Sequence, residues 1–585
     1  MDIFAILTLA GGLGLFLYGM EVMGDSLKKL AGGKLEMILS KLTANRFIGF
    51  LLGFFVTSII QSSSATTVML VGFVNSGIMK LGQTIAVIMG ANVGTTVTAW
   101  LLSLSGIDGS GPIWLKLLKP TSFTPVLMVI GVVMVMACKS DKKKNIASIL
   151  IGFAVLMFGM DMMSGAMSGL KDDPSFRNLL IAFENPILAI LAGTILTAII
   201  QSSSASVGIL QALALSCDIP FTVAIPVILG QNIGTTITPV ISSITGNTES
   251  KRVAISCVYI KVIGVTIVFS AFSILHSIFD FPFMHMNATI AGIATVHTVY
   301  NVIAASILIW FSKPIAALAV KTIRSKKQEE VSEFDVLDDR FLSIPSVAVE
   351  RCRELVCTMS MKARDAVIDA TSLIEKYNKE LVDKIIDSEN LIDVYEDKIS
   401  SYLVKIAKTD LSDADSKTTT ELLQCISDIE RISDYSAIIT QNLEEIERKE
   451  LKFSDSALSE LNVISSAVTE LIAMTHEAFE KDDLAVAKNV EPLRQVVDRL
   501  KVKIKTNHVV RLQEGKCSIE MGLILSDLLN NYSRIADHCS NVAVCMLEID
   551  RDSMEAHGHV SNMVHTEEFF TEQYKMYKEK YSIAK

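Results

Sequence analysis

The chain has 585 residues, of which 50% are hydrophobic, and its formal net charge is −10. A mean hydropathy of +0.43 excludes a soluble protein of this length, and the negative charge gives no indication of nucleic-acid binding. Residues 1 to about 315 are apolar, whereas charged side chains are concentrated after residue 321. We therefore expect a part embedded in the lipid bilayer, followed by a soluble part.

The first part contains a series of strongly apolar segments, several of them long enough to cross a bilayer as helices. They lie at residues 3–20, 47–79, 82–105, 122–138, 145–163, 187–216, 220–245, 253–275 and 288–312.

Three short motifs recur within these segments. LYGMEVM around Gly19 returns as MFGMDMM around Gly159, TSIIQSSSA at 57–65 as TAIIQSSSA at 197–205, and GANVGTT at 90–96 as GQNIGTT at 230–236. Every shift is 140 residues (159 − 19, 201 − 61, 230 − 90). Because all three motifs share the same shift, the sequence indicates an internal duplication. Repeat 1 comprises residues 1–140, and repeat 2 with a final helix comprises residues 141–315.

Loop charges predict the orientation, because Lys and Arg in short loops favour the cytoplasm. The loops at 28–46 and 139–144 are basic, whereas 171–186 is acidic and 279–286 has no Lys or Arg. We expect the N-terminus outside and repeat 2 inverted relative to repeat 1, an architecture of many secondary transporters. Lys116 and Lys119 fall outside in this scheme and oppose it.

The repeated QSSS motifs each place four consecutive polar side chains in an apolar stretch, at Gln61–Ser64 and Gln201–Ser204. Unsatisfied polar groups are costly in lipid, so these side chains must face a cavity or other protein. Four consecutive side chains point to all sides of an intact helix, so some of them would face lipid. We therefore expect a broken or re-entrant segment at each motif. The paired glycines of the GxNxGTT motifs predict a second break of the same kind.

Charged residues are rare beside these motifs: only Lys80 and Asp108 lie between Arg46 and Leu115, and only Asp218 between Asn185 and Thr248. Hydroxyls and amide oxygens suit sodium, while helix N-termini and hydroxyl donors suit an oxyanion. We expect an anion here to have no lysine or arginine partner, so that cotransported cations supply the positive charge. This favours symport. Hydrogen bonding between packed helices is the alternative interpretation of the serine runs.

With both motif pairs in view, residues 5 to about 312 resemble the type II sodium/phosphate cotransporter family in its bacterial form. The resemblance implies a non-enzymatic, sodium-coupled symport of inorganic phosphate across the cytoplasmic membrane by alternating access, with the QSSS segments in re-entrant hairpins that face each other. A membrane-bound phosphate sensor or scaffold, and a symporter of another small oxyanion, are the alternatives. Carried over by position, the phosphate and sodium site would comprise Gln61, Ser62, Ser63, Ser64, Asn92, Thr95, Thr96, Gln201, Ser202, Ser203, Ser204, Asn232, Thr235 and Thr236.

In the second part we expect a charged linker at 316–344 and a helical bundle at 345–585. The bundle is expected because helical periodicity continues there and Pro492 is the only proline beyond Pro345. An extra helix is expected after Glu555. DIERISDY at 428–435 recurs as NYSRIADH at 531–538, a shift of 103 residues (537 − 434). This part resembles the PhoU-type regulatory domain, and we expect it in the cytoplasm.

That resemblance implies two three-helix repeats with acidic faces that can hold divalent or iron metal. No other cofactor is expected. Glu430 and Asp434, at i and i+4, and Asp537 are the candidate ligands. Ser533 stands where the second copy should have its acid, so a solvated acidic face with ordinary salt bridges is the alternative. The predicted fold class is all-α, a polytopic membrane protein of two inverted repeats with a cytoplasmic helical bundle, and the sequence leaves open whether it forms a homo-oligomer.

Overall fold

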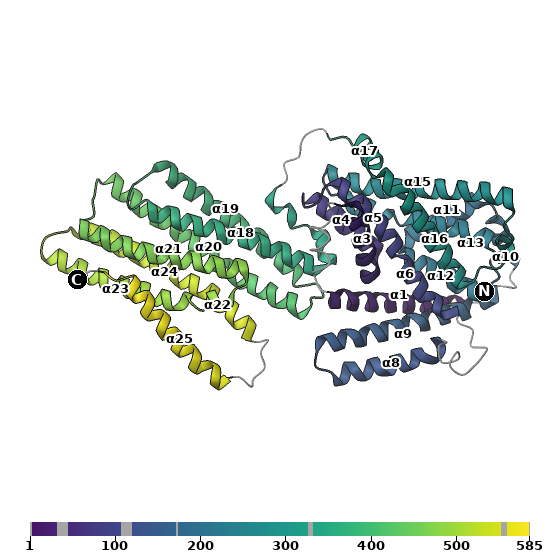
Figure 1. Cartoon of the computed structure of the whole chain (residues 1–585), viewed down its shortest axis with the longest axis horizontal. Helices are drawn as coiled ribbons and strands as arrows, with labels where there is room; N and C mark the ends of the chain where they lie inside the picture. The colour runs from purple at the N-terminus through teal and green to yellow at the C-terminus, as the bar shows by residue number, and fades with distance from the viewer. Residues whose placement is uncertain are drawn as a thin grey trace. The chain divides into compact units, whose positions relative to one another are not determined.

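The structure of the protein, a computed structural model, describes residues 3–31, 45–106, 120–170, 174–325, 332–551 and 559–583. These residues form helices and no β-strand, apart from an isolated bridge between Pro220 and Asn287. The chain divides into two compact units, Met1–Val347 and Ala348–Lys585 (Figure 1). The all-α prediction is confirmed. Lys116 and Lys119 lie outside the described residues.

Unit 1 contains the apolar helices, and six of its described helical segments are long and apolar enough to cross a membrane. Its helices are α1 (Ile3–Ala31), α3 (Arg46–Ile60), α4 (Ser63–Asn75), α5 (Leu81–Gly94), α6 (Thr96–Ser103), α8 (Pro120–Ala137), α9 (Asp141–Met167), α10 (Pro174–Ala182), α11 (Pro186–Ile200), α12 (Ser203–Ser216), α13 (Phe221–Gly234), α14 (Ile237–Ser243), α15 (Thr248–Phe279), α16 (Ile290–Leu308) and α17 (Ser312–Thr322).

A helix break occurs at each QSSS motif. Gln61 follows α3 with a left-handed backbone (φ 59°), and Gln201 follows α11 in the same conformation (φ 60°). Ser62 and Ser202 then cap the next helices, each accepting a hydrogen bond from the backbone amide three residues later. A left-handed backbone at a non-glycine residue costs about 1 kcal/mol or more, so the surrounding structure must hold it. The predicted breaks at these motifs are confirmed.

The glycines of the GxNxGTT motifs serve a different purpose from the one predicted. Thr95, between α5 and α6, has right-handed helical dihedrals, so the chain does not turn sharply there. A Cβ built on Gly90 would lie 1.9 Å from the Phe50 carbonyl oxygen, and one on Gly230 would lie 1.9 Å from that of Ile190. A helix boundary does occur at each motif, between α5 and α6 and between α13 and α14, but without the left-handed residue of the QSSS breaks. The glycines let α3 and α11 pack directly against α5 and α13.

The duplication is visible in the helix boundaries and in one helix pair. The bounds of α11 and α13 equal those of α3 and α5 plus 140 (186 − 46, 221 − 81). Helices α1 and α9, which carry the first motif pair, lie side by side (Figure 1). Gly12 faces Met163 and Gly19 faces Leu156 across this pair. Residue numbers rise on one helix as they fall on the other, so α1 and α9 run antiparallel.

Part of the segment between the two predicted parts packs on unit 1. It contains two short 3₁₀ helices, η5 (Glu333–Val336) and η6 (Asp339–Ser343). Phe341 is fully buried with its ring 5.4 Å from that of Phe73, and Asp338 accepts a hydrogen bond from Asn75 at 2.9 Å. Residues 332–343 therefore belong to the packed structure of unit 1.

Unit 2 is a bundle of long helices. They are α18 (Pro345–Ser372), α19 (Lys379–Ile406), α20 (Asp413–Arg448), α21 (Asp455–Lys481), α22 (Leu484–Ala487), α23 (Val490–Gln513), α24 (Ile519–Arg551) and α25 (His559–Lys580). The motif-bearing helices α20 and α24 pack against each other. Helix α21 is apolar enough to cross a membrane, but its buried face packs on α23 and α24. Helix α25 is the predicted extra helix, and Lys580 pairs with Glu470 of α21 at 2.6 Å.

Candidate functional site

A small polar cavity lies inside unit 1, where α4, α5, the α13–α14 junction and α15 come together. Its volume is about 20 Å³, which is enough for one water-sized particle. It is lined by Ser63, Ser64, Thr67, Ile88, Asn92, Thr235, Thr236, Pro239, Cys257 and Lys261. Five of the sequence-predicted site residues thus share one cavity, and they come from both repeats.

The two QSSS motifs meet directly beside this cavity. The Ser64 hydroxyl donates a hydrogen bond to the Gln201 backbone oxygen at 3.3 Å. Ser64 lies in the first turn of α4, and Gln201 lies immediately before the N-cap of α12. Free amide groups at helix starts attract anions, so the contact places two anion-attracting helix ends close together.

Several predicted site residues stabilise the backbone near the cavity. Gln61 is buried, and its amide donates to the Ser58 carbonyl at 2.5 Å and accepts from the Thr98 hydroxyl at 2.8 Å. Thr95 and Thr96 donate to carbonyl oxygens one turn earlier in their helices. Together with the capping serines Ser62 and Ser202, these side chains shape the helix ends that surround the cavity.

The remaining predicted residues belong to repeat 2. Ser203 and Ser204 are buried in the first turn of α12, and the Gln201 side chain is exposed. Asn232 is buried, with its amide nitrogen donating to the Ile228 carbonyl and its amide oxygen accepting from Lys261 at 2.9 Å.

Lys261 was missed by the sequence reasoning. It lies on α15, is 7% exposed and lines the cavity. The prediction that almost no charged residue lies beside these motifs is therefore wrong, because it considered only the segments that carry the motifs. A lysine within the apolar segment 253–275 was the available signal, since an ionisable residue inside a membrane span is a candidate site residue.

Among the described residues of repeat 2, four buried side-chain oxygens have no hydrogen-bond partner, on Thr197, Ser206, Gln211 and Gln231. The Gln231 amide nitrogen donates to the Ser206 carbonyl at 3.0 Å, so the two residues are neighbours. At the equivalent positions of repeat 1, the Thr57 hydroxyl donates to that of Thr66 at 3.0 Å. The unsatisfied hydroxyls of Thr197 and Ser206 thus distinguish repeat 2 from repeat 1, and Gln231 corresponds to Ala91, which has no polar side chain.

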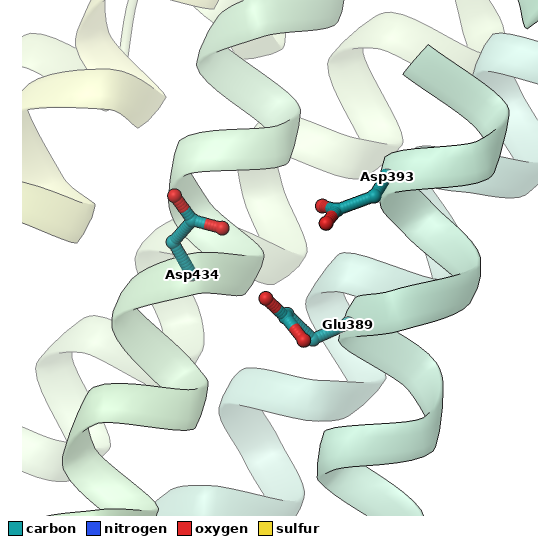
Figure 2. A group of neighbouring side chains, drawn as sticks. All are labelled: Glu389, Asp393 and Asp434. Atoms are coloured by element: carbon teal, nitrogen blue, oxygen red, sulfur yellow. The ribbon is translucent and has the colours of Figure 1, made fainter. Parts of the chain in front are cut away.

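Unit 2 carries a separate acidic group on α19 and α20. Figure 2 shows the carboxylates of Glu389, Asp393 and Asp434 pointing toward one another, and one oxygen of each lies within 4.8 Å of the others. Of the predicted ligands, only Asp434 is in this group. Glu389 and Asp393 were missed, although their i, i+4 spacing matches that of Glu430 and Asp434. Carboxylate oxygens suit hard divalent cations, so the donor set fits such a metal.

Burial and neighbouring negative charges raise the pKa values of Glu389, Asp393 and Glu430 on this face. Burial and the charges of Asp434 and Glu396 raise the pKa of Glu430 from 4.5 to about 7. Burial and the charges of Asp393 and Asp434 likewise raise the pKa of Glu389. The face therefore has an excess of negative charge that a bound cation would relieve.

In the second copy, Arg494 provides a cation among the carboxylates. Its guanidinium contacts Glu491 and Asp498 at 2.7 Å and Asp537 at 3.3 Å. Ser533 donates to Asp498 at 2.8 Å. Asp537 thus takes part in a salt-bridge network, away from the acidic group of the first copy.

The fold and these sites define a multi-span membrane protein with a polar cavity between two related halves, joined to a helical domain with an acidic face. The Na+/Pi-cotransporter family matches residues 15–165 and 156–298, and the PhoU domain family matches 356–443 and 461–546. The chain belongs to the Na+/Pi-cotransporter family and carries a PhoU domain in its C-terminal half.

Curated relatives match different lengths of this chain. YjbB of Escherichia coli K12, whose name refers to inorganic phosphate export, is 23% identical over 93% of this chain and 97% of its own. YqeW of Bacillus subtilis is 32% identical over 43% of this chain and 78% of its own. The rat sodium-dependent phosphate transport protein 2A is 36% identical over 16% of this chain and 15% of its own.

Proposed function

We propose that the chain is a sodium-coupled symporter of inorganic phosphate that works by alternating access in the cytoplasmic membrane. The observation that carries this proposal is the meeting of the two QSSS helix starts, at Ser64 and Gln201, beside a polar cavity lined by both repeats. In a member of the Na+/Pi-cotransporter family, hydroxyls and helix starts at that position are suited to a phosphate oxyanion.

Sodium coupling is supported by the oxygen chemistry of repeat 2. Sodium is a hard cation that prefers hydroxyl, amide and carbonyl oxygens. Thr197, Ser206 and Gln231 offer three buried oxygens that lack a protein hydrogen-bond donor. A cation among them would satisfy oxygens that are otherwise costly to bury.

Alternating access is supported by two features. The repeat-equivalent helices α1 and α9 run antiparallel, as expected for repeats of inverted topology. The cavity of about 20 Å³ is too small for phosphate, so its walls must separate for the anion to enter or leave. Movement of one repeat against the other would open this cavity, which both repeats line.

The test is uptake of labelled phosphate into proteoliposomes that contain the purified full-length chain. We expect uptake with external sodium and none when choline replaces it, and Ser64→Ala should reduce the initial rate at least tenfold. Phosphate uptake that is independent of sodium would contradict the coupling, and binding without any uptake would favour a phosphate sensor. Sulfate and arsenate as competitors would test the anion preference.

The direction of phosphate movement has two candidates. The resemblance of the QSSS motifs favours uptake, whereas the name of YjbB, matched along nearly the whole chain, favours export. Right-side-out and inside-out vesicles from cells that produce the protein would separate them. Sodium-driven accumulation only in inside-out vesicles would support export.

We also propose that unit 2 is a cytoplasmic regulatory domain that binds a divalent metal ion at Glu389, Asp393 and Asp434. The basic loops at 28–46 and 139–144 support an orientation with the N-terminus outside and unit 2 inside. The metal would neutralise the carboxylates and draw α19 and α20 together at this face.

A further inference from the structure

Lys261 places a basic side chain at the cavity that the proposed symport would use. It comes from α15 and reaches the wall that Ser63 and Ser64 line from the opposite repeat. The residue is 7% exposed, and its side-chain nitrogen donates a hydrogen bond to the Asn232 amide oxygen at 2.9 Å. It is the one charged side chain among the described residues that line this cavity.

The charge of Lys261 is not neutralised by a carboxylate. Its hydrogen-bond acceptor is a neutral amide, and Lys261 forms no salt bridge with an Asp or Glu among the described residues. A buried ammonium is strongly unfavourable unless an opposite charge lies beside it. Among the described residues, this buried amine therefore has no carboxylate beside it.

The cavity offers an anion several further partners next to this ammonium. Ser63 and Ser64 belong to the first turn of α4, a 13-residue helix, and the hydroxyl of Thr67 also lines the wall. Ammonium, hydroxyl donors and a helix start are together the recognition chemistry of a phosphate oxyanion. A carboxylate from the protein would compete with such an anion, and none lines this cavity among the described residues.

We propose that Lys261 is an anion-binding residue of this transporter and that its ammonium takes the place of one cotransported cation. This inference rests on the proposed function, and it adds a consequence. A doubly charged phosphate beside Lys261 needs one sodium ion to reach neutrality, whereas the same site without the lysine needs two. Phosphate should therefore retain measurable affinity in the absence of sodium.

The experiment measures equilibrium binding of labelled phosphate to the purified full-length chain in detergent, in choline and in sodium. We compare the unmodified protein with Lys261→Met, Lys261→Arg and Lys251→Gln. Lys251 lies on the same helix ten residues earlier and outside the cavity (261 − 251), so it is a matched control.

We expect Lys261→Met to weaken phosphate binding in choline at least tenfold, and to raise the sodium concentration that supports half-maximal binding at least threefold. Lys261→Arg should bind within about fivefold of the unmodified protein because it keeps the charge. Lys251→Gln should bind as the unmodified protein does. Equal binding by Lys261→Met and the unmodified protein in both salts would overturn the inference.

Thermal unfolding separates this role from a structural role through Asn232. If the ammonium awaits an anion, Lys261→Met removes an uncompensated buried charge and raises Tm in phosphate-free buffer, while the stabilisation by added phosphate becomes smaller. If Lys261 mainly holds Asn232 in place, Lys261→Met lowers Tm without phosphate, and that result would contradict the proposal.

The proposed function and this inference can fail separately. Sodium-driven uptake with unchanged phosphate affinity in Lys261→Met would leave the symport standing and remove the role of Lys261. Phosphate binding that depends on Lys261, without uptake in proteoliposomes, would support the role of Lys261 and contradict the symport.

Discussion

At the scale of single residues, the site depends on side chains that hold unusual backbone positions. Gln61 has a left-handed backbone and is buried, and its amide joins the Ser58 carbonyl to the Thr98 hydroxyl. Its partner in repeat 2, Gln201, has the same backbone but an exposed side chain. The side chain of Gln61 therefore contributes more to the stability of the fold than that of Gln201.

Gln61→Ala should abolish phosphate uptake and lower the free energy of unfolding by about 1–3 kcal/mol, since it leaves buried polar groups without partners. Gln201→Ala should lower it by less than about 0.5 kcal/mol, because an exposed side chain contributes little to stability. Thermal or denaturant unfolding in detergent measures the difference. Equal destabilisation by the two substitutions would contradict the asymmetry.

Residue patterns predicted the break at each QSSS motif, because four successive polar side chains cannot all avoid lipid on an intact helix. They did not predict Lys261, since the helix that carries it begins after the motifs and reaches the cavity only through tertiary packing. Oxygens without a hydrogen-bond partner, such as that of Gln231, could not be predicted from the sequence either, because the partners depend on neighbouring helices.

At the scale of helices, glycine positions determine how closely the repeats pack internally. The sequence indicated where these glycines lie but suggested the wrong role, because a helical glycine and a turn glycine look alike in sequence. Gly90 lies where α5 crosses α3, whereas a Cβ on Gly82, at the start of the same helix, would meet no atom within 4 Å.

Gly90→Ala should destabilise unit 1 by about 3 kcal/mol or more, because the new methyl group would overlap the Phe50 carbonyl and force the helices apart. Gly82→Ala should be neutral or slightly stabilising, since alanine favours the helix. The yield of monodisperse protein and its Tm measure both effects. A normal Tm for Gly90→Ala would show that α3 and α5 are packed less tightly than described.

The acidic faces of the PhoU domain give a second contrast between helices. Calorimetric titration of the full-length chain with Mn²⁺ should show binding that Asp434→Asn weakens at least tenfold and Asp537→Asn leaves nearly unchanged, because Arg494 already supplies a cation beside Asp537. Loss of binding in Asp537→Asn alone would place the metal on the other face.

The same titration should depend on pH. With a pKa of about 7, Glu430 is mostly protonated at pH 6 and mostly ionised at pH 8, so metal affinity should rise by about tenfold between them. Without metal, higher pH should destabilise the protein. The folded state holds the Glu430 proton more tightly than the unfolded state, so the free energy of unfolding falls as pH rises from 4.5 to about 7. Glu430→Gln should flatten both dependences.

At the scale of the whole molecule, the boundary between the two units lies at Val347. The change from apolar to charged sequence predicted two parts, but it did not predict that residues 332–343 pack on unit 1. That packing depends on Phe341, a single buried aromatic side chain within a charged stretch.

A chain that ends at Val347 should fold and take up phosphate, whereas one that ends at Thr322 should be less stable because it loses the contact between Phe341 and Phe73. In the full-length protein, Phe341→Ala should lower the free energy of unfolding by about 3–5 kcal/mol. Unfolding transitions of the three proteins test this. Equal stability of the two shortened chains would place the boundary nearer Thr322.

The central claim is that phosphate movement is driven by sodium through the cavity between the repeats. The most direct measurement is accumulation of labelled phosphate in proteoliposomes with an imposed sodium gradient, compared with equal sodium on both sides. We predict transient accumulation above the external phosphate concentration with the gradient and simple equilibration without it. Equilibration in both conditions would contradict coupled transport.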